Sequence, residues 1–193
     1  MIPTLKQVKL KEFGYLPVGA NVTNGTVSYE AGRFYISVVI DIDENSKYNK
    51  DLETSYHTTT KGIGIDLGIK NLAISSNGKI FKNINKSSKV KKLEKRLKHL
   101  QRQLSRKYEF RKKKGGKTAA ASANIEKQKL KVQKLHHRIN EIREDYENKV
   151  IHEIVKQKPS FITVEDLNLK GMMKNRHLAK AVAAQRFNYL LTK

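Results

Sequence analysis

The sequence lacks cysteine, long apolar runs and a leader peptide, and each absence excludes a class of protein. Without cysteine, none of the 193 residues can form a disulfide or hold zinc through a thiolate. No apolar run approaches the length that spans a bilayer, and no basic segment followed by an apolar one opens the chain. We therefore expect a cytoplasmic protein that has no membrane partner and binds no zinc.

Acidic residues are also scarce. The chain has 40 Lys and Arg against 18 Asp and Glu, which gives a formal net charge of +22. Such a charge repels itself in a compact state unless a polyanion shares the surface. DNA or RNA is the natural candidate for that polyanion.

The N-terminal part is rich in β-forming residues. Residues 1–45 predict strands, with Val8 and Leu10 alternating with lysines. Two β-rich runs, Thr26–Tyr29 and Arg33–Ile42, are joined by the short turn Glu30-Ala31-Gly32, which predicts a β-hairpin. Residues 46–60 are crowded with polar side chains and predict a linker between two domains.

A second β region follows this linker. Between Gly62 and Ile69, apolar residues alternate with three glycines and Asp66, so that the two sets lie on opposite faces of a strand. Asn71–Ser75 and Lys79–Lys82 predict two more strands, separated by a Ser-Asn-Gly turn signal. The pattern favours three antiparallel strands in sequence.

The apolar period then changes to three and four residues. Apolar stripes along residues 90–104 and 132–146 predict two long helices. They should pack as an antiparallel hairpin over about residues 87–157, with a turn at Lys114–Ser122. Pro159 breaks the second helix, Phe161–Val164 predict a buried strand, and His177 to Leu191 predict a last amphipathic helix.

The helical hairpin is strongly basic. From Lys86 to Arg143 there are 21 Lys or Arg against four Glu and no Asp. Helix faces that contact only solvent usually carry both acidic and basic side chains, which form i,i+4 ion pairs. The excess of basic over acidic residues therefore favours nucleic-acid contact over simple solvation. The residues that we expect to contact nucleic acid are Lys92, Arg96, Arg102, Arg106, Lys107, Arg111, Lys112, Lys113 and Lys117.

Asp66 and Glu165 are the candidate catalytic residues. Asp66 shares its strand face with glycines, which let a metal ion or a phosphate approach closely, and its carboxylate can hold Mg²⁺. Glu165 ends an apolar strand, where ligand sites gather in sheets with parallel strands. If the two strands are parallel neighbours, the carboxylates can meet, and two metal ions about 4 Å apart could serve phosphodiester cleavage. The arrangement indicates a ribonuclease-H-like nuclease with both carboxylates as metal ligands.

Plainer interpretations of these residues exist. A lone Asp in a strand is often an edge or turn residue, and a Glu after a strand commonly caps the next helix. Only the combination of strand types, their order and the basic insert favours a catalytic role for Asp66 and Glu165 over these interpretations. Gly115-Gly116-Lys117-Thr118 is similar to the tail of a phosphate-binding P-loop, but Arg111 stands where that motif needs glycine. Gly64–Gly68 also resembles the first phosphate loop of actin-type and Hsp70-type ATPases, whose second Asp-x-Gly loop is missing here.

Two segments carry a family resemblance. Gly62-Ile63-Gly64-Ile65-Asp66-Leu67-Gly68-Ile69-Lys70-Asn71-Leu72-Ala73 closely resembles the first RuvC motif of TnpB-type (OrfB-type) proteins of bacterial insertion sequences. Phe161-Ile162-Thr163-Val164-Glu165-Asp166-Leu167-Asn168-Leu169-Lys170-Gly171-Met172-Met173 is similar to their second RuvC motif. The basic hairpin between them, Gln185-Arg186-Phe187 and the run Gly32–Ser37 resemble the family as well.

The resemblance implies a fold and a function. The fold is α/β: an incomplete ribonuclease-H-like (RuvC) mixed sheet with an inserted helical hairpin in residues 61–193, preceded by a partial wedge-like β-barrel segment in residues 1–45. Full-length members are RNA-guided DNA endonucleases linked to transposition, which implies Mg²⁺ as cofactor, DNA and a guide RNA as partners, and Asp66 and Glu165 as the first two catalytic carboxylates. The family's third catalytic Asp and its Cys-rich zinc ribbon are missing from these 193 residues. The chain is therefore expected to be a middle segment, and a non-catalytic DNA- or RNA-binding remnant stays open as the alternative.

Overall fold

The computed structural model describes residues 8–12, 14, 16, 20–41, 61–113 and 119–192. The chain divides into two compact units, Met1–His57 and Thr58–Lys193, and each is described by itself. The predicted linker at residues 46–60 lies outside the described residues. No helix in the described ranges is long and apolar enough to cross a membrane.

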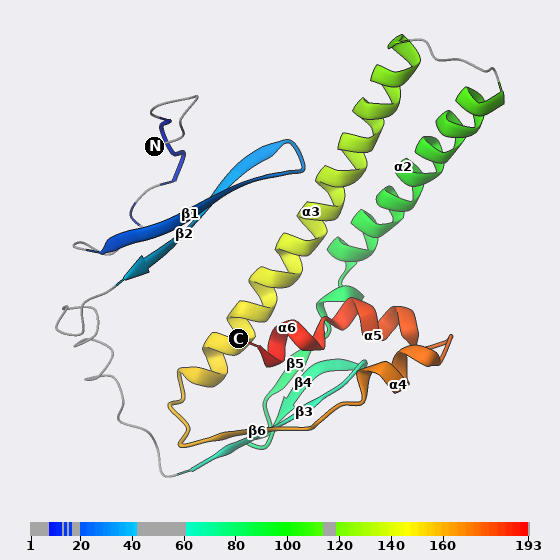
Figure 1. The fold of residues 1–193 in the computed structure, drawn as a ribbon. Helices are drawn as coiled ribbons and strands as arrows, with labels where there is room; N and C mark the ends of the chain where they lie inside the picture. The colour runs from blue at the N-terminus through cyan, green and yellow to red at the C-terminus, as the bar shows by residue number, and fades with distance from the viewer. Residues whose placement is uncertain are drawn as a thin grey trace. The chain divides into compact units, whose positions relative to one another are not determined.

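The first unit contains a two-stranded antiparallel sheet. Strands β1 (Asn21–Glu30) and β2 (Arg33–Asp41) are joined by Ala31 and Gly32, whose φ angles are 50° and 83° (Figure 1). Positive φ at both central residues is what a type I′ turn requires, and its twist matches that of the flanking strands. The predicted hairpin is confirmed. The strand expected around Val8 and Leu10 is wrong: residues 8–12 form no regular structure, and these two apolar side chains are half exposed instead of lying on a buried strand face.

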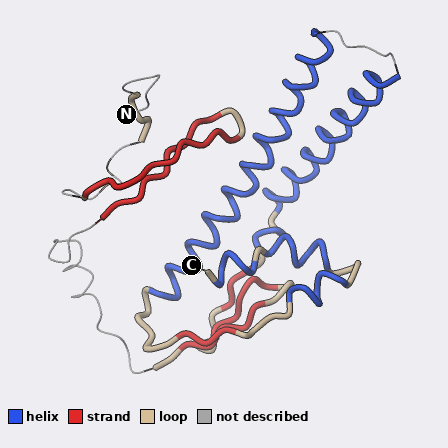
Figure 2. The backbone as a smooth tube through the Cα atoms, in the orientation of Figure 1, coloured by secondary structure: helices blue, strands red, loops and turns tan. Residues whose placement is uncertain are grey.

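The second unit contains a four-stranded mixed sheet in the order β5-β4-β3-β6 (Figure 2). Strands β3 (Ile63–Leu67), β4 (Asn71–Ser75) and β5 (Ile80–Lys82) are antiparallel neighbours, as the sequence predicts. Strand β6 (Ile162–Val164) pairs with β3 in parallel. The expectation of a buried strand there is wrong, because β6 pairs on one side only and lies at the edge, where Ile162 is 43% exposed.

One face of this sheet is covered by helices. The predicted alternation in β3 is confirmed: Ile63, Ile65 and Leu67 are buried, whereas Asp66 between them is exposed. The buried face packs on Val150 and Ile154 of the second long helix and on residues of the last two helices. Figure 1 shows these helices on one side of the sheet. The opposite face of β3 carries Gly64 and the exposed Asp66, and no helix of the described residues lies over it; we call it the open face.

The two long helices form the predicted hairpin. Helix α2 (Ser88–Lys113) follows a short 3₁₀ turn, η1 (Ile84–Lys86), and packs on α3 (Ala119–Val155) through a separate apolar cluster. Contacts at successive levels join Lys107 to Asn124 and Glu94 to Arg143, so the helices run antiparallel. The predicted turn at 114–122 is too long, because residues 119–122 already belong to α3, and the alanines at 119–121 favour helix.

The C-terminal part consists of three short helices, α4 (Leu169–Lys174), α5 (Ala179–Gln185) and α6 (Phe187–Leu191). The single helix predicted from His177 to Leu191 is wrong. It is broken at Arg186, which takes a left-handed conformation with φ 50° and ψ 39°. This conformation is unfavourable for a residue with a Cβ, but it carries the guanidinium to Glu144 (2.9 Å) and over the Tyr189 ring.

Candidate functional site

Asp66 and Glu165 occupy equivalent positions on two neighbouring parallel strands. The register pairs Ile63 with Ile162, Gly64 with Thr163 and Ile65 with Val164. The next residue on β3 is Asp66, and Glu165 directly follows the last residue of β6. Parallel strands end at the same edge of a sheet, so the fold brings the two predicted carboxylates side by side across a separation of about a hundred residues in sequence.

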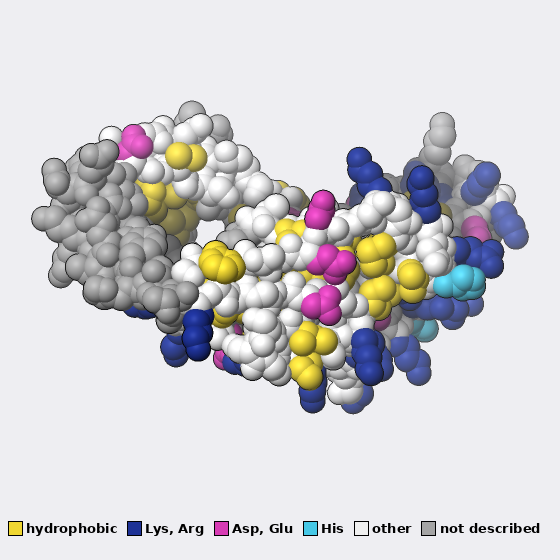
Figure 3. Space-filling model, turned by 90° about the horizontal axis from the view of Figure 1, so that it is seen from below, with side chains coloured by type: hydrophobic (Ala, Val, Ile, Leu, Met, Phe, Trp, Pro, Cys, Tyr) yellow, Lys and Arg dark blue, Asp and Glu magenta, His cyan; other side chains and the backbone are white. Residues whose placement is uncertain are grey.

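Both carboxylates line one hollow on the open face of the sheet. It has a volume of about 430 Å³, and its lining comes from three strands and their ends: Gly64, Ile65, Asp66, Ile74, Ser75, Ser76, Thr163 and Glu165. Figure 3 shows this side of the unit, where a few Asp and Glu side chains gather near the middle and Lys and Arg side chains lie around them. The sequence prediction did not include Ser76 and Thr163. Thr163 could have been found from its position two residues before Glu165, because alternate residues of a strand share a face.

Gly64 lines the hollow and has no side chain to fill it. A Cβ at this position would lie 3.7 Å from the Ser76 Cβ, which is an ordinary contact, so the structure does not need glycine for packing. Ser76 holds this stretch of β3 in place: its Oγ accepts from the Gly64 N–H (3.1 Å), and its own N–H donates to the Gly64 carbonyl (2.8 Å). A bare backbone beside two carboxylates leaves room for a cation or a phosphate.

The two carboxylates carry charge without a cationic partner in the part of the chain that the structure describes. Among the described residues neither Asp66 nor Glu165 forms an ion pair, although the chain carries 40 Lys and Arg. The described part of the chain contains no group of three or more His, Asp or Glu side chains that could hold a metal ion. Two carboxylates still fit Mg²⁺, which usually keeps several waters and takes one or two carboxylates together with substrate phosphates.

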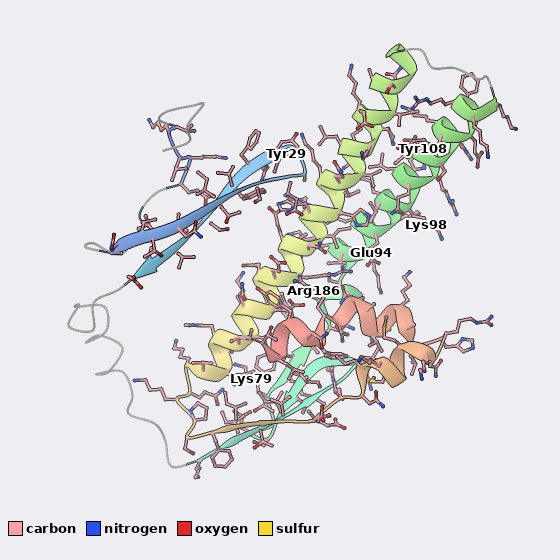
Figure 4. The ribbon with its side chains drawn as sticks, in the orientation of Figure 1. Tyr29, Lys79, Glu94, Lys98, Tyr108 and Arg186 are labelled. Atoms are coloured by element: carbon pink, nitrogen blue, oxygen red, sulfur yellow. The ribbon has the colours of Figure 1, made fainter. Side chains whose placement is uncertain are left out.

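Eight of the nine predicted nucleic-acid contacts lie on α2. Seven of them are exposed, Arg111 is half-buried, and Lys117 lies outside the described residues; the exposed ones are Lys92, Arg96, Arg102, Arg106, Lys107, Lys112 and Lys113. The helix carries twelve Lys or Arg and only two acids, Glu94 and Glu109. Figure 4 shows Glu94, Lys98 and Tyr108 following one another along this helix. Since the apolar stripe faces α3, most of these cations are exposed to solvent.

Polar side chains join the base of the hairpin to η1 and α5. Arg143 of α3 donates to Asn85 Oδ1 (2.7 Å) and to Glu94 Oε1 (3.0 Å). Burial lowers the pKa of Arg143, and the charge of Glu94 opposes that effect. Asn85 in turn donates to the Ala184 carbonyl (2.9 Å), so one cluster joins η1, both long helices and α5.

Gln185 connects the same cluster to the strand end next to Asp66. It is 1% exposed, its Nε2 donates to the Gly68 carbonyl (2.7 Å), and its Oε1 accepts from Asn85 Nδ2 (3.3 Å). The sequence gave no reason to expect this contact, because it joins residues more than a hundred positions apart. The position of the Asp66 strand end is therefore coupled to the hairpin base.

A buried acid lies beneath this cluster. Glu147 of α3 is 2% exposed, and its Oε2 lies 3.8 Å from Arg186 Nη1 without a hydrogen bond. Burial raises the pKa of Glu147 to about 7, the charge of Arg186 opposes this, and neighbouring Glu144 adds to it. No pattern in the sequence distinguishes Glu147 from the other acids of α3.

Comparison with known proteins matches most of the chain. Residues 37–176 match the model of a family described as "Probable transposase", OrfB_IS605. "Putative RNA-guided DNA endonuclease InsQ" of Escherichia coli K12 is 36% identical over 154 residues, which are 80% of this chain and 33% of that protein. "Putative RNA-guided DNA endonuclease" of Streptomyces pristinaespiralis is 32% identical over 169 residues, 87% of this chain and 36% of that protein. The chain thus spans about a third of the length of the curated relatives that it matches.

Proposed function

We propose that this chain, which belongs to the OrfB_IS605 family of probable transposases, serves as the RuvC-type, metal-dependent cleavage element of a transposon-associated, RNA-guided DNA endonuclease. The single observation that carries the proposal is the register that aligns Asp66 with Glu165. The reaction class comes from the relatives, whose names describe them as putative RNA-guided DNA endonucleases. The basic hairpin is the proposed surface for the polyanionic partners.

Asp66 and Glu165 are the proposed ligands of Mg²⁺. When bound there, the metal would supply Lewis-acid stabilisation of the phosphodiester and activation of a water. The chain's own residues position the scissile strand: the bare backbone at Gly64 lets a phosphate approach, and the hydroxyl of Thr163 lines the same hollow. Both carboxylates act as acceptors only, so without a cation they would repel that phosphate.

The partners follow from charge. DNA and a guide RNA are both polyanions, and the exposed cations of α2 would hold their phosphates without reading sequence. In RNA-guided systems the sequence is read by base pairing, and the protein contacts the backbone.

The proposed division of the chain assigns residues 61–193 to the RuvC-like domain and residues 1–45 to a wedge-like segment.

Mg²⁺-dependent cleavage tests this function. The chain is incubated with labelled single-stranded and duplex DNA, with and without RNA, and with Mg²⁺ or EDTA. The expected result is cleavage that needs Mg²⁺ and is lost in Asp66→Ala and in Glu165→Ala. Cleavage that survives Asp66→Ala overturns the assignment of the site.

The alternative function is nucleic-acid binding without cleavage. It is favoured by one observation, that no third metal-ligating side chain joins Asp66 and Glu165 among the described residues. Binding of DNA or RNA by a chain that shows no Mg²⁺-dependent cleavage would support this alternative.

A further inference from the structure

The segment that follows Asp166 contains basic residues and no acidic ones. From Leu167 to Lys193 the sequence has six Lys or Arg and no Asp or Glu, whereas residues 144–166 have six acids and three Lys. Four of these six cations are exposed and lie on α4, on α5 or between them: Lys170, Lys174, Arg176 and Lys180. An exposed surface that carries charge of one sign is a candidate contact for a polyanion.

The two lysines of α4 lie on its exposed face. Leu169 and Met172 pack against the apolar cluster in which β3 buries its own side chains, so one side of α4 faces that core. Lys170, Met173 and Lys174 are exposed, and their spacing of three and four residues places them side by side on the helix. Met173 is 45% exposed. The exposed face therefore combines two cations with one apolar side chain.

Asn175 fixes the turn between α4 and α5. Its Oδ1 accepts from the His177 N–H (3.0 Å), and its carbonyl accepts from the Ala179 N–H (2.8 Å). Arg176 belongs to this turn and is exposed. These bonds hold the backbone that carries Arg176, which adds a third cation next to the end of α4. We call Lys170, Met173, Lys174 and Arg176 the α4 surface.

The α4 surface follows the carboxylate pair closely along the chain. Lys170 is five residues after Glu165, and Figure 1 shows α4 directly after the end of β6. A chain extends at most about 3.6 Å per residue, so the Cα atom of Lys170 lies within about 18 Å of the Cα atom of Glu165. One strand of DNA advances about 3.4 Å per nucleotide even when it is stacked in a duplex. A segment of roughly five nucleotides therefore reaches from the carboxylates to α4.

We propose that the α4 surface binds an unpaired DNA strand that has one of its phosphates at Asp66 and Glu165. This inference rests on the proposed function, in which that pair holds a metal at a scissile phosphate. Because the two carboxylates are acceptors only and add negative charge, the cations of the α4 surface would hold the neighbouring phosphates of the strand. The strand is unpaired because Met173 can contact a splayed base, whereas the outside of a duplex presents phosphates and sugars.

Removal of charge from the full chain tests the surface. One variant carries Gln at the three cations of the α4 surface, and the control carries Gln at Lys79, Lys129 and Lys149, which each pair with an acid. Both variants lose three positive charges. Binding of single-stranded DNA, single-stranded RNA and duplex DNA is measured by fluorescence anisotropy at several salt concentrations. The α4 variant should reduce the slope of log affinity against log salt for single-stranded DNA by up to about 2, because each phosphate contact contributes about 0.7. Its duplex slope and both slopes of the control should stay nearly unchanged.

Met173 offers a test that leaves the charge unaltered. Met173→Ser should weaken binding of single-stranded DNA about fivefold, as expected when the exposed half of a Met side chain leaves water, and should leave duplex binding unchanged. Leu191→Ser is the matched control, because Leu191 is 44% exposed on α6 and lies outside the α4 surface. It should bind all three probes as the wild type does.

The outcomes separate the α4 surface from the proposed function. A reduced slope for single-stranded DNA, with or without RNA, supports the surface, and a reduction confined to RNA or to the duplex overturns it. A single-strand slope equal to that of the control also overturns it, and unchanged affinity in Met173→Ser overturns the contact with an unpaired base. In these cases salt-dependent binding through α2 leaves the proposed function standing. Cleavage that survives Asp66→Ala contradicts the proposed function whatever the α4 variant shows.

Discussion

Asp66 and Glu165 stand at the same level on adjacent parallel strands, one position beyond the paired residues Ile65 and Val164. β3 is an inner strand of the sheet and β6 an edge strand, so Glu165 lies next to solvent while Asp66 has a neighbour on each side. Backbone pairing of β3 with β6 therefore sets the relative position of the two carboxylates, and Gln185 connects the end of β3 to the base of the hairpin.

The bare backbone at Gly64 should be needed for ligand approach and not for folding. Gly64→Val puts a branched side chain into the hollow, while its Cβ meets Ser76 at an ordinary 3.7 Å. We expect unchanged thermal unfolding, within about 0.5 kcal/mol, and loss of Mn²⁺ binding measured by calorimetry. Gly25→Val, a strand glycine of the first unit with a comparable contact at 3.6 Å, is the control and should retain the metal. Unaltered Mn²⁺ affinity in Gly64→Val would show that the glycine is incidental.

The cations of α2 should set the salt dependence of DNA binding. Replacing Lys92, Arg96 and Arg106 by Gln should reduce the slope of log affinity against log salt by up to about 3, because each phosphate contact contributes about 0.9. Lys79 and Lys149 provide a control, since they already pair with Glu153 and Asp145. Replacing these two by Gln should leave the slope nearly unchanged. Equal effects of the two sets per charge removed would mean that net charge alone governs binding.

Gln185 should matter for stability more than an exposed Gln does. Gln185→Leu leaves the Gly68 carbonyl and the Asn85 amide without this buried partner, which costs about 1–3 kcal/mol. Gln133→Leu on the exposed side of α3 should change stability by no more than about 0.5 kcal/mol. Urea unfolding of both variants measures the difference, and similar midpoints would contradict the coupling between the hairpin base and β3.

Glu147 should make the folded chain less stable as pH rises. Its pKa is raised in the folded state to about 7 from an ordinary 4.5, so the folded state binds the proton more tightly than the unfolded state. The favourable contribution of the protonated form is complete below about pH 4.5 and is lost as pH rises to about 7, with a cost of at most about 3 kcal/mol. Glu147→Gln should reduce the slope of melting temperature with pH across this window. Glu126→Gln, at an exposed site on the same helix, should leave that slope unchanged. A slope unchanged in Glu147→Gln would refute this assignment.

Local patterns in the sequence predicted where each strand and helix lies better than they predicted how that element is packed in the fold. Alternation around Asp66 and the apolar stripes of the hairpin located β3, α2 and α3, because both patterns reflect which side of one element is buried. The exposure of β6 and the break at Arg186 were missed, since the first depends on strand order and the second on Glu144 in a distant helix. The carboxylate pair could be predicted because each member ends or interrupts an apolar strand. Gln185 and Glu147 could not, because their partners are distant in sequence.

The most direct measurement is Mn²⁺ binding followed by electron paramagnetic resonance, which counts free Mn²⁺ independently of any cleavage. The wild-type chain with a short DNA should bind Mn²⁺, Asp66→Asn and Glu165→Gln should each lose that binding, and Asp166→Asn, next to the pair but outside the hollow, should keep it. Mn²⁺ binding that is the same in all four proteins would contradict the proposal that Asp66 and Glu165 form the metal site.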